Sequence, residues 1–292
     1  MLAVLLSLGA ALTFSLSAMA VNAVAGRVGV WQLGRWQMGI SFVLTAGAAT
    51  LVGGWASVHP WQFGLLAASS AAGIMLATTT YLAAIHAAGP RVTALLFSLA
   101  SPFAVLEGWL FLGESLSAAQ LSGIGLILLG IVLAILAEHD PHPDDRPTKP
   151  LWIGIVLGII TSVGQATGSL LARPAMEAGV EPFTAMAIRS GLGGLFFLAL
   201  LAFPFARASR LPAASDLRYV SLSAFFGMFL GMSLMMAALV NGDVGIVSTL
   251  TSTTPILILP MIWFTTRRAP GLPAWIGAGI AVAGTALISL SA

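Results

Sequence analysis

Hydrophobic residues along this chain fall into ten long runs separated by polar connections that are mostly short. A helix needs about 20 apolar residues to cross the hydrocarbon core of a bilayer, and every run is close to that length. Short connections make consecutive helices antiparallel neighbours. We therefore predict an all-α integral membrane protein with ten transmembrane helices, at residues 2–22, 33–53, 62–84, 91–112, 117–137, 151–172, 183–204, 218–239, 244–264 and 272–291.

The longest polar stretch, residues 138–150, reads EHDPHPDDRPTKP. Its four prolines and six charges are incompatible with a helix. We interpret it as a linker between an N-terminal repeat, residues 1–137, and a C-terminal repeat, residues 151–292. Each half has five predicted helices. After an odd number of crossings the second half enters the membrane from the opposite side, so the two repeats are expected to be inverted, an arrangement typical of secondary transporters.

The two halves also repeat each other in sequence. Gly89 and Pro102 recur as Gly242 and Pro255, 153 positions later. After the polar turn Gly113-Glu114-Ser115 the offset becomes 154, which pairs Gly123 with Gly277, Gly125 with Gly279 and Gly130 with Gly284. Two pairs before the turn share the offset of 154, Gly73 with Gly227 and Arg35 with Arg189. An internal repeat of this length determines the architecture. Small residues at such spacings let helices pack closely, so we interpret the fifth and tenth helices as a scaffold and a candidate dimer contact.

Composition agrees with a membrane protein and excludes several other classes. Hydrophobic residues make up 58 % of the 292 residues and charged residues 8 %, against about 25 % charged in a soluble domain. No clustered basic face suggests nucleic-acid binding. The chain has no cysteine, which excludes disulfides and thiolate metal sites. All eight tryptophans lie near the ends of predicted helices, as in an interfacial aromatic belt.

The proline-bearing helix, the Gly-Glu turn and the glycine-spaced helix together resemble the drug/metabolite transporter superfamily, specifically the EamA-type permeases and their amino-acid exporter branch. The pattern is most specific at Pro102, Gly113-Glu114 and Gly123, and at Pro255 and Gly277. This resemblance implies export of a small metabolite by alternating access. It also implies a central cavity lined by the first, third, fourth, sixth, eighth and ninth helices. In the second half the turn reads Thr266-Arg267, so its acidic residue is missing.

The resemblance and the charges disagree about orientation. Lysine and arginine are concentrated in the connections that follow odd-numbered helices, and Arg173 alone follows an even-numbered one. The positive-inside rule then places both termini outside the cytoplasm, whereas the family resemblance implies cytoplasmic termini. Both orientations stay open. We expect a multi-pass protein of the bacterial inner membrane.

Hydroxyl and amide side chains at mid-depth are the candidate substrate ligands. Ser98 and Ser101 precede Pro102, as Thr251 and Thr254 precede Pro255. Residues three apart share a helix face, and a proline frees backbone carbonyls that can line a cavity or form a hinge. The alternative is that these hydroxyls bond to their own helix and only permit close packing.

Two further polar positions complete the candidate lining. Gln165 can both donate and accept hydrogen bonds, which suits an amino-acid carboxylate or ammonium group; the alternative is an interhelical clamp. In the third helix a polar run contains Thr79 and Tyr81, our candidates for its cavity-facing side.

Three ionisable residues are candidates for proton coupling. Intramembrane charges are usually paired, so Glu107 and Arg189, which lie near the same membrane side, are interpreted either as a structural ion pair or as a proton-coupling carboxylate with its partner. His86 titrates in a range suited to proton sensing, although its position beside Gly89-Pro90 also fits an interfacial site.

These features predict a secondary transporter that exports amino acids or related small metabolites. The alternative is a drug or cation efflux permease, which would require a deep, unpaired carboxylate. We expect no enzymatic activity, because no catalytic dyad, phosphate-binding loop or HExxH motif is present. No cofactor and no metal site are expected. The expected partners are the substrate and the bilayer, not nucleic acid, and the sequence leaves the oligomeric state open.

Overall fold

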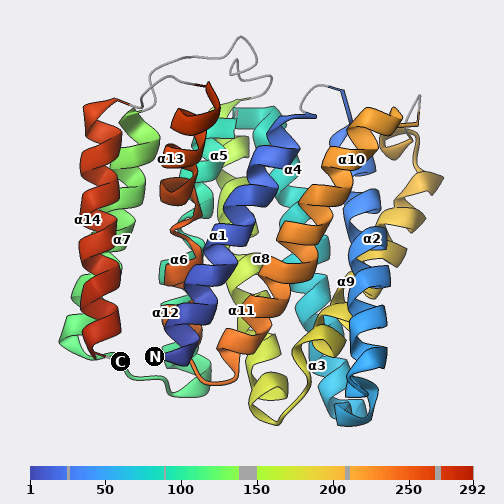
Figure 1. Ribbon diagram of the computed structural model, residues 1–292, viewed down its shortest axis with the longest axis horizontal. Helices are drawn as coiled ribbons and strands as arrows, with labels where there is room; N and C mark the ends of the chain where they lie inside the picture. The colour runs from blue at the N-terminus through green and yellow to red at the C-terminus, as the bar shows by residue number, and fades with distance from the viewer. Residues whose placement is uncertain (25–26, 89, 138–149, 208–210, 267–270, 292) are drawn as a thin grey trace.

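The computed structural model describes every residue except 25–26, 89, 138–149, 208–210, 267–270 and 292, and omits the side chains of 86, 90, 91, 95, 134–137, 262, 265, 266, 289 and 291 (Figure 1). All regular structure in the described part is helical. The elements are α1 (Leu2–Asn22), α2 (Val30–Leu51), η1 (Gly54–Ser57), α3 (Pro60–Ser70), η2 (Ala71–Leu76), α4 (Ala77–Ala88), α5 (Pro90–Phe97), α6 (Ala100–Glu107), η3 (Gly108–Leu112), α7 (Ala118–Ala137), α8 (Leu151–Glu177), α9 (Pro182–Ala199), η5 (Leu200–Ala202), η6 (Pro204–Ala206), α10 (Ala214–Ser223), η7 (Ala224–Gly231), α11 (Met232–Leu239), α12 (Val244–Thr251), α13 (Thr254–Thr266) and α14 (Leu272–Ser291).

Six helical runs in the described residues are long and apolar enough to cross a membrane: Leu2–Asn22, Pro60–Ile85, Leu151–Glu177, Pro182–Ala202, Ala214–Ala238 and Val244–Met261. Shorter apolar helices cover Ala100–Leu112, Ala118–Leu133 and Leu272–Ile288. Helix α2 belongs to neither group, because Gln32, Arg35 and Gln37 lower the hydropathy of its first half. The all-helical membrane class is confirmed, while the count of ten crossings stays a prediction.

The two halves show matching irregularities. Helical segments with π-type hydrogen bonding occupy η2 in the first half and η7 in the second. They contain Gly73 and Gly227, which the sequence pairs at an offset of 154. Irregularities repeated at equivalent positions are structural support for the sequence repeat.

Helices of one half of the chain pack against helices of the other half. Helix α1 packs on η7 and α11, and in the same way α8 packs on η2 and α4. Helix α2 packs on α9, and α6 on α12. The tightest pair, α7 with α14, stands at one edge of the bundle, and both chain termini lie at the same end (Figure 1).

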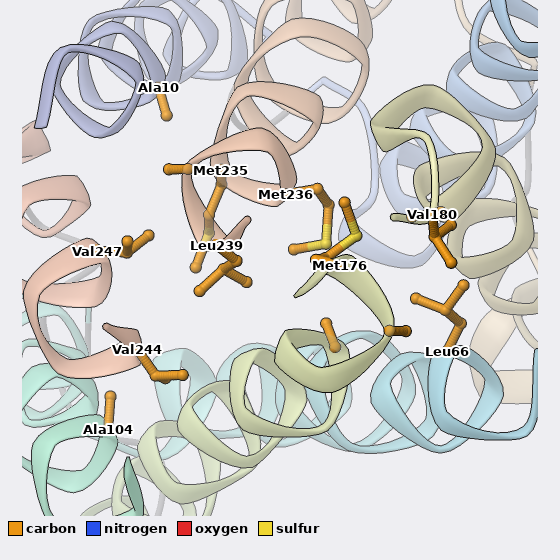
Figure 2. Close-up of a cluster of buried hydrophobic side chains, with 14 of the residues drawn as sticks. Ala10, Leu66, Ala104, Met176, Val180, Met235, Met236, Leu239, Val244 and Val247 are labelled. Carbon is orange, nitrogen blue, oxygen red and sulfur yellow. The ribbon is translucent and has the colours of Figure 1, made fainter. Parts of the chain in front are cut away.

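The helices are held together by two large buried clusters. The first joins α3, α8, α9, α11 and α12 through alanine, methionine and branched side chains, with Met176, Met236 and Leu239 near its centre (Figure 2). The second joins α7, α12, α13 and α14 around Ile127 and Leu250. Small residues dominate where helices approach most closely: a Cβ on Gly123 would lie 2.8 Å from the carbonyl oxygen of Gly284.

Candidate functional site

The candidate site lies where two helical runs are interrupted at equivalent positions. The run of α5 and α6 breaks at Ser98-Leu99, and the run of α12 and α13 breaks at Ser252-Thr253. Leu99 has φ −68° and ψ −11°, and Ser252 has φ −70° and ψ −5°. These residues are 153 positions apart, the offset that relates the two prolines in the sequence. The breaks are therefore a repeated feature of the fold.

Local hydrogen bonding explains the breaks. The amide of Leu99 donates to Leu96 O at 3.0 Å and that of Thr253 to Leu250 O at 3.2 Å, so the helix tightens to i→i−3 bonding at both places. Pro102 and Pro255 then fall in the first turn of α6 and α13, where a missing N–H is tolerated. Each proline thus restarts a helix after a break, which agrees with the predicted kink.

Three of the four predicted hydroxyl residues at the breaks are buried and Thr254 is half-buried, and their hydrogen bonds differ. Ser101 hydrogen-bonds to Thr249, which joins α6 to α12. The hydroxyl of Thr251 returns to its own helix, donating to Val247 O at 2.9 Å. Pro255 has no N–H to donate to Thr251 O, and the Thr254 hydroxyl takes the place of that donor, at 2.8 Å. Ser98 is buried as well.

Sequence reasoning missed two partners of this set. Thr249 was not singled out, although it lies five positions before Thr254 on the same run. Ser15 of α1 was also missed; its hydroxyl donates to Thr254 O at 3.1 Å and to Ala11 O at 2.8 Å. The repeat is least distinctive in α1 and in the sixth predicted helix, α8, so sequence spacing gave no signal for the contact of Ser15.

Helix α8 connects the first-half break to the third run. The Ser162 hydroxyl donates to Leu96 O at 2.7 Å, directly at the break. Thr161 bonds Thr80 of α4 across 2.8 Å. Gln165 is half-buried, and in the described part of the chain its side-chain amide has no hydrogen-bond partner. The amide is thus available to a ligand rather than engaged as a clamp.

The third run places its predicted residues differently. The hydroxyl of Thr79 donates to Met75 O of its own helix at 2.6 Å, not to another helix. Thr80, its neighbour, makes the interhelical bond to Thr161. The ring of Tyr81 packs edge-on against Phe97, with centroids 5.6 Å apart, beside the first-half break.

Glu107 and Arg189 are not paired with each other. One carboxylate oxygen of Glu107 accepts a hydrogen bond from Thr167 at 3.0 Å, and the other is buried with no partner among the residues that the structure describes. Arg189 donates to the Met236 sulfur at 3.3 Å, and its Nε is likewise buried with no partner in the described part of the chain. No ion pair within 4.0 Å joins them among the described residues, because α8 lies between α6 and α9. The side chain of His86 lies outside the described residues.

Charged residues that form ion pairs lie at the ends of the bundle. Arg27 pairs with Asp216 at 2.9 Å. At the other end Arg173 pairs with Glu177 at 2.7 Å and donates to the carbonyls of Leu239 and Gly242. Glu114, a residue of the predicted turn, accepts from the Val244 amide at 2.8 Å and so caps α12. The turn thereby connects the first half to the second.

Four hydroxyl side chains around the paired breaks are buried in this conformation, whereas Leu99 is exposed. Ser101 and Thr249 are fully buried, and Ser98 and Thr251 nearly so. Two pockets lie elsewhere. The first is lined by Ala72, Leu76, Ile159, Ile160, Val163, Gly164 and Thr167, and the second by Val105, Trp109, Glu114, Ser115, Leu116 and Leu121. We refer to this arrangement, in which the four hydroxyls are buried, as the closed state.

An all-helical apolar bundle with two matched, interrupted runs defines a multi-pass membrane permease. A sequence model of the EamA-like transporter family matches residues 1–136 and 152–290, so the chain belongs to that family. Known structures share the fold: one, described only as the crystal structure of a protein, has a TM-score of 0.84 and is 20 % identical, over 99 % of this chain and 97 % of that one. No curated protein matches the sequence.

Proposed function

We propose that this EamA-family transporter exports amino acids or related small metabolites by alternating access. The observation that carries the proposal is the pair of matched helix breaks, at Leu99 and Ser252. Transporters bind substrate near the bilayer midplane at the interface of inverted repeats, where discontinuous helices expose backbone groups and helix ends. The two breaks meet through Ser101 and Thr249, so a cavity opening there would be lined by both halves.

We further propose the architecture that this mechanism requires. Residues 1–137 and 151–292 would form two inverted repeats of five crossings, joined by residues 138–150. Helix α1 of the first half packs on η7 of the second half, and α8 of the second half packs on η2 of the first. This reciprocal packing supports the inverted relationship. The connections that follow odd-numbered predicted helices carry most of the lysine and arginine, which favours the membrane face opposite the termini as cytoplasmic. A bacterial inner membrane is the proposed location.

Substrate recognition is assigned to the polar groups around the breaks. Gln165, with a free amide, is the proposed central ligand, with Ser98, Ser101, Thr251 and Thr254 on the interrupted runs. Thr79 and Tyr81 complete the lining from the third run. Several of these hydroxyls bond to their own helix in the closed state, so binding substrate would exchange those bonds for contacts to the ligand.

A second candidate function, efflux of organic cations, is favoured by one observation. The second oxygen of Glu107 is buried and unpartnered, and a cationic ligand would satisfy it. The same carboxylate, alone or with His86, is our candidate for proton coupling. Cation binding and proton coupling would both use Glu107, so the dependence of transport on substrate charge and its dependence on pH must be measured separately.

Uptake into proteoliposomes distinguishes these functions. Radiolabelled neutral amino acids and a radiolabelled quaternary ammonium ion would be compared, each with and without a pH gradient. Saturable uptake of amino acids, competed by other amino acids, supports the exporter. Uptake of the ammonium ion without amino-acid uptake would replace it with the efflux function.

A further inference from the structure

Arg189 is a buried cation that the fold leaves without an anion. Its side chain is 1 % exposed. Its one described side-chain hydrogen bond goes to the sulfur of Met236, a weak acceptor, and its Nε has no partner. Among the described residues no carboxylate lies within 4.0 Å of the guanidinium. Burying an unpaired charge carries a large desolvation penalty, so the position calls for an anion from outside the chain.

The equivalent arginine in the first half shows that the repeat does not require this burial. Arg35 occupies the position 154 residues earlier. It is only partly buried, and its guanidinium donates to Ala206 O at 2.8 Å, near the end of the bundle. Arg189 instead points into the bundle, although it lies only about 10 Å along the axis from the start of α9. Arg35 is therefore an interfacial arginine with a carbonyl acceptor, whereas Arg189 is an interior arginine without an anion among the described residues.

The guanidinium of Arg189 lies between the two halves. A Cβ on Gly73, in η2 of the first half, would lie 3.2 Å from Nη2. On the other side is Met236 of α11, in the second half. Segments with π-type bonding are frequent at functional sites, and Arg189 faces one of them directly.

The surroundings of Arg189 can rearrange to admit a ligand. Met236 lies beside Met176 of α8, and their sulfur atoms face each other (Figure 2). Methionine side chains are flexible and repack around different partners. Gly73 and Gly168 meet backbone to backbone on the remaining side, so a small movement between α8 and η2 would open space next to the guanidinium without removing a side chain.

We infer that Arg189 binds the carboxylate group of the transported solute. A guanidinium matches a carboxylate with two parallel N–H donors, and the unpartnered Nε is one of those donors. This inference rests on the proposed function and narrows it: the substrates are solutes with a carboxylate, and organic cations without one are excluded. Thr167 of α8, one residue before Gly168, donates a hydrogen bond to Glu107. The carboxylate of Glu107 therefore lies at a similar depth to Arg189 but does not pair with its guanidinium.

Ligand-induced thermal stabilisation of the full-length purified protein tests the inference. The probes are alanine, threonine, leucine and methionine, each compared with its own carboxamide and with sodium chloride. The wild type is expected to be stabilised by the amino acids and not by their amides. Arg189→Met should weaken amino-acid binding by about 10- to 100-fold, the value of a charge-assisted hydrogen bond, and Arg189→Lys by less. Arg35→Met, the matched control, should bind like the wild type.

The possible outcomes separate the inference from the proposed function. Equal stabilisation by amino acids and amides, or by chloride, would overturn the carboxylate assignment, as would unchanged amino-acid binding in Arg189→Met. If Arg189→Met fails to fold, the wild-type comparison of acid with amide and the Arg189→Lys variant still decide. Carboxylate-selective binding without transport in proteoliposomes would keep the inference and reject the proposed function. Transport of amino acids without carboxylate-selective binding would keep the proposed function and reject the inference.

Discussion

Ser101 and Thr249 hydrogen-bond to each other across the two interrupted helical runs, and both side chains are fully buried. Thr249 uses its single proton to bond Gly245 O at 2.7 Å. Ser101 is therefore the donor in the pair, and Thr249 is its acceptor. The bond holds α6 and α12 together in the closed state.

This geometry predicts an asymmetric response to substitution. Thr249→Val leaves the Ser101 hydroxyl buried without an acceptor and should destabilise by about 1–3 kcal/mol. Ser101→Ala leaves Thr249 still bonded to Gly245, so its effect should be smaller. The double variant should be more stable than Thr249→Val alone. Thermal unfolding in detergent measures all three. Ser252→Ala is the control because, among the described residues, that hydroxyl bonds only to Ser248 O in its own run. Equal effects of the two single changes would contradict the assignment of donor and acceptor.

The contact between α7 and α14 predicts a contrast between two glycines on one helix. A Cβ on Gly130 would lie 2.8 Å from the backbone nitrogen of Ala281, whereas a Cβ on Gly125 meets nothing within 4 Å. Gly130→Ala should therefore destabilise by about 1–3 kcal/mol through overpacking. Gly125→Ala should be neutral or slightly stabilising, since alanine favours a helix. The comparison uses the apparent melting temperature, and equal loss in both variants would show that the helices do not pack on this face.

Glu114 predicts a pH dependence of stability. It lies in the connection between η3 and α7, outside the helices. Burial raises its pKa above the usual 4.5, and Asp243 adds to the rise; hydrogen bonds from the Val244 and Gly245 amides and the charge of Arg173 oppose it. Because the folded-state pKa is the higher one, the contribution of this group is fully present below pH 4.5 and is lost as the pH rises through the folded-state pKa.

Glu114→Gln should flatten that dependence. The glutamine oxygen can still accept the Val244 amide proton, but it does not titrate. Melting temperatures measured from pH 4.5 upwards should fall in the wild type and fall less in the variant. Asp216→Asn is the control, since that carboxylate pairs with Arg27 at the other end of the bundle. A variant whose melting temperature follows the wild-type curve would remove Glu114 as the cause.

Glu107 predicts an effect on transport rather than on stability. Glu107→Gln keeps an acceptor for Thr167 but removes the proton-binding carboxylate. If Glu107 couples protons, amino-acid uptake by this variant should become independent of a pH gradient while exchange without a gradient persists. Proteoliposomes loaded at matched and unmatched pH make the measurement. A gradient dependence equal to that of the wild type would assign Glu107 to structure.

Much of the fold was predictable because membrane burial leaves a strong signal. Apolar runs located the helices, and the glycines at 123, 130, 277 and 284 marked α7 and α14 as helices that pack closely, although the sequence did not indicate that they pack on each other. Pro102 and Pro255 located both helix breaks, since a proline lacks the N–H that would continue the helix. These signals are local in the chain, so spacing alone reveals them.

The partners across helices were not predictable in the same way. The sequence suggested an ion pair between Glu107 and Arg189, because the two charges lie at similar depth. The depth of a residue in the membrane does not say which way its side chain points around the helix axis, and α8 lies between Glu107 and Arg189 in the structure. The bond between Thr80 and Thr161 and the role of Thr249 depend on how helices rotate about their axes, which packing over the whole bundle decides.

The most direct test of the central claim is two-sided access to the paired breaks. The chain has no cysteine, so Thr254→Cys introduces a single thiol at the second break. An impermeant thiol reagent would be applied to right-side-out and to inside-out membrane vesicles, with and without amino acids. Alternating access predicts labelling from both sides and a changed rate when substrate is present. Labelling from neither side, or from one side only with no effect of amino acids, would contradict the account.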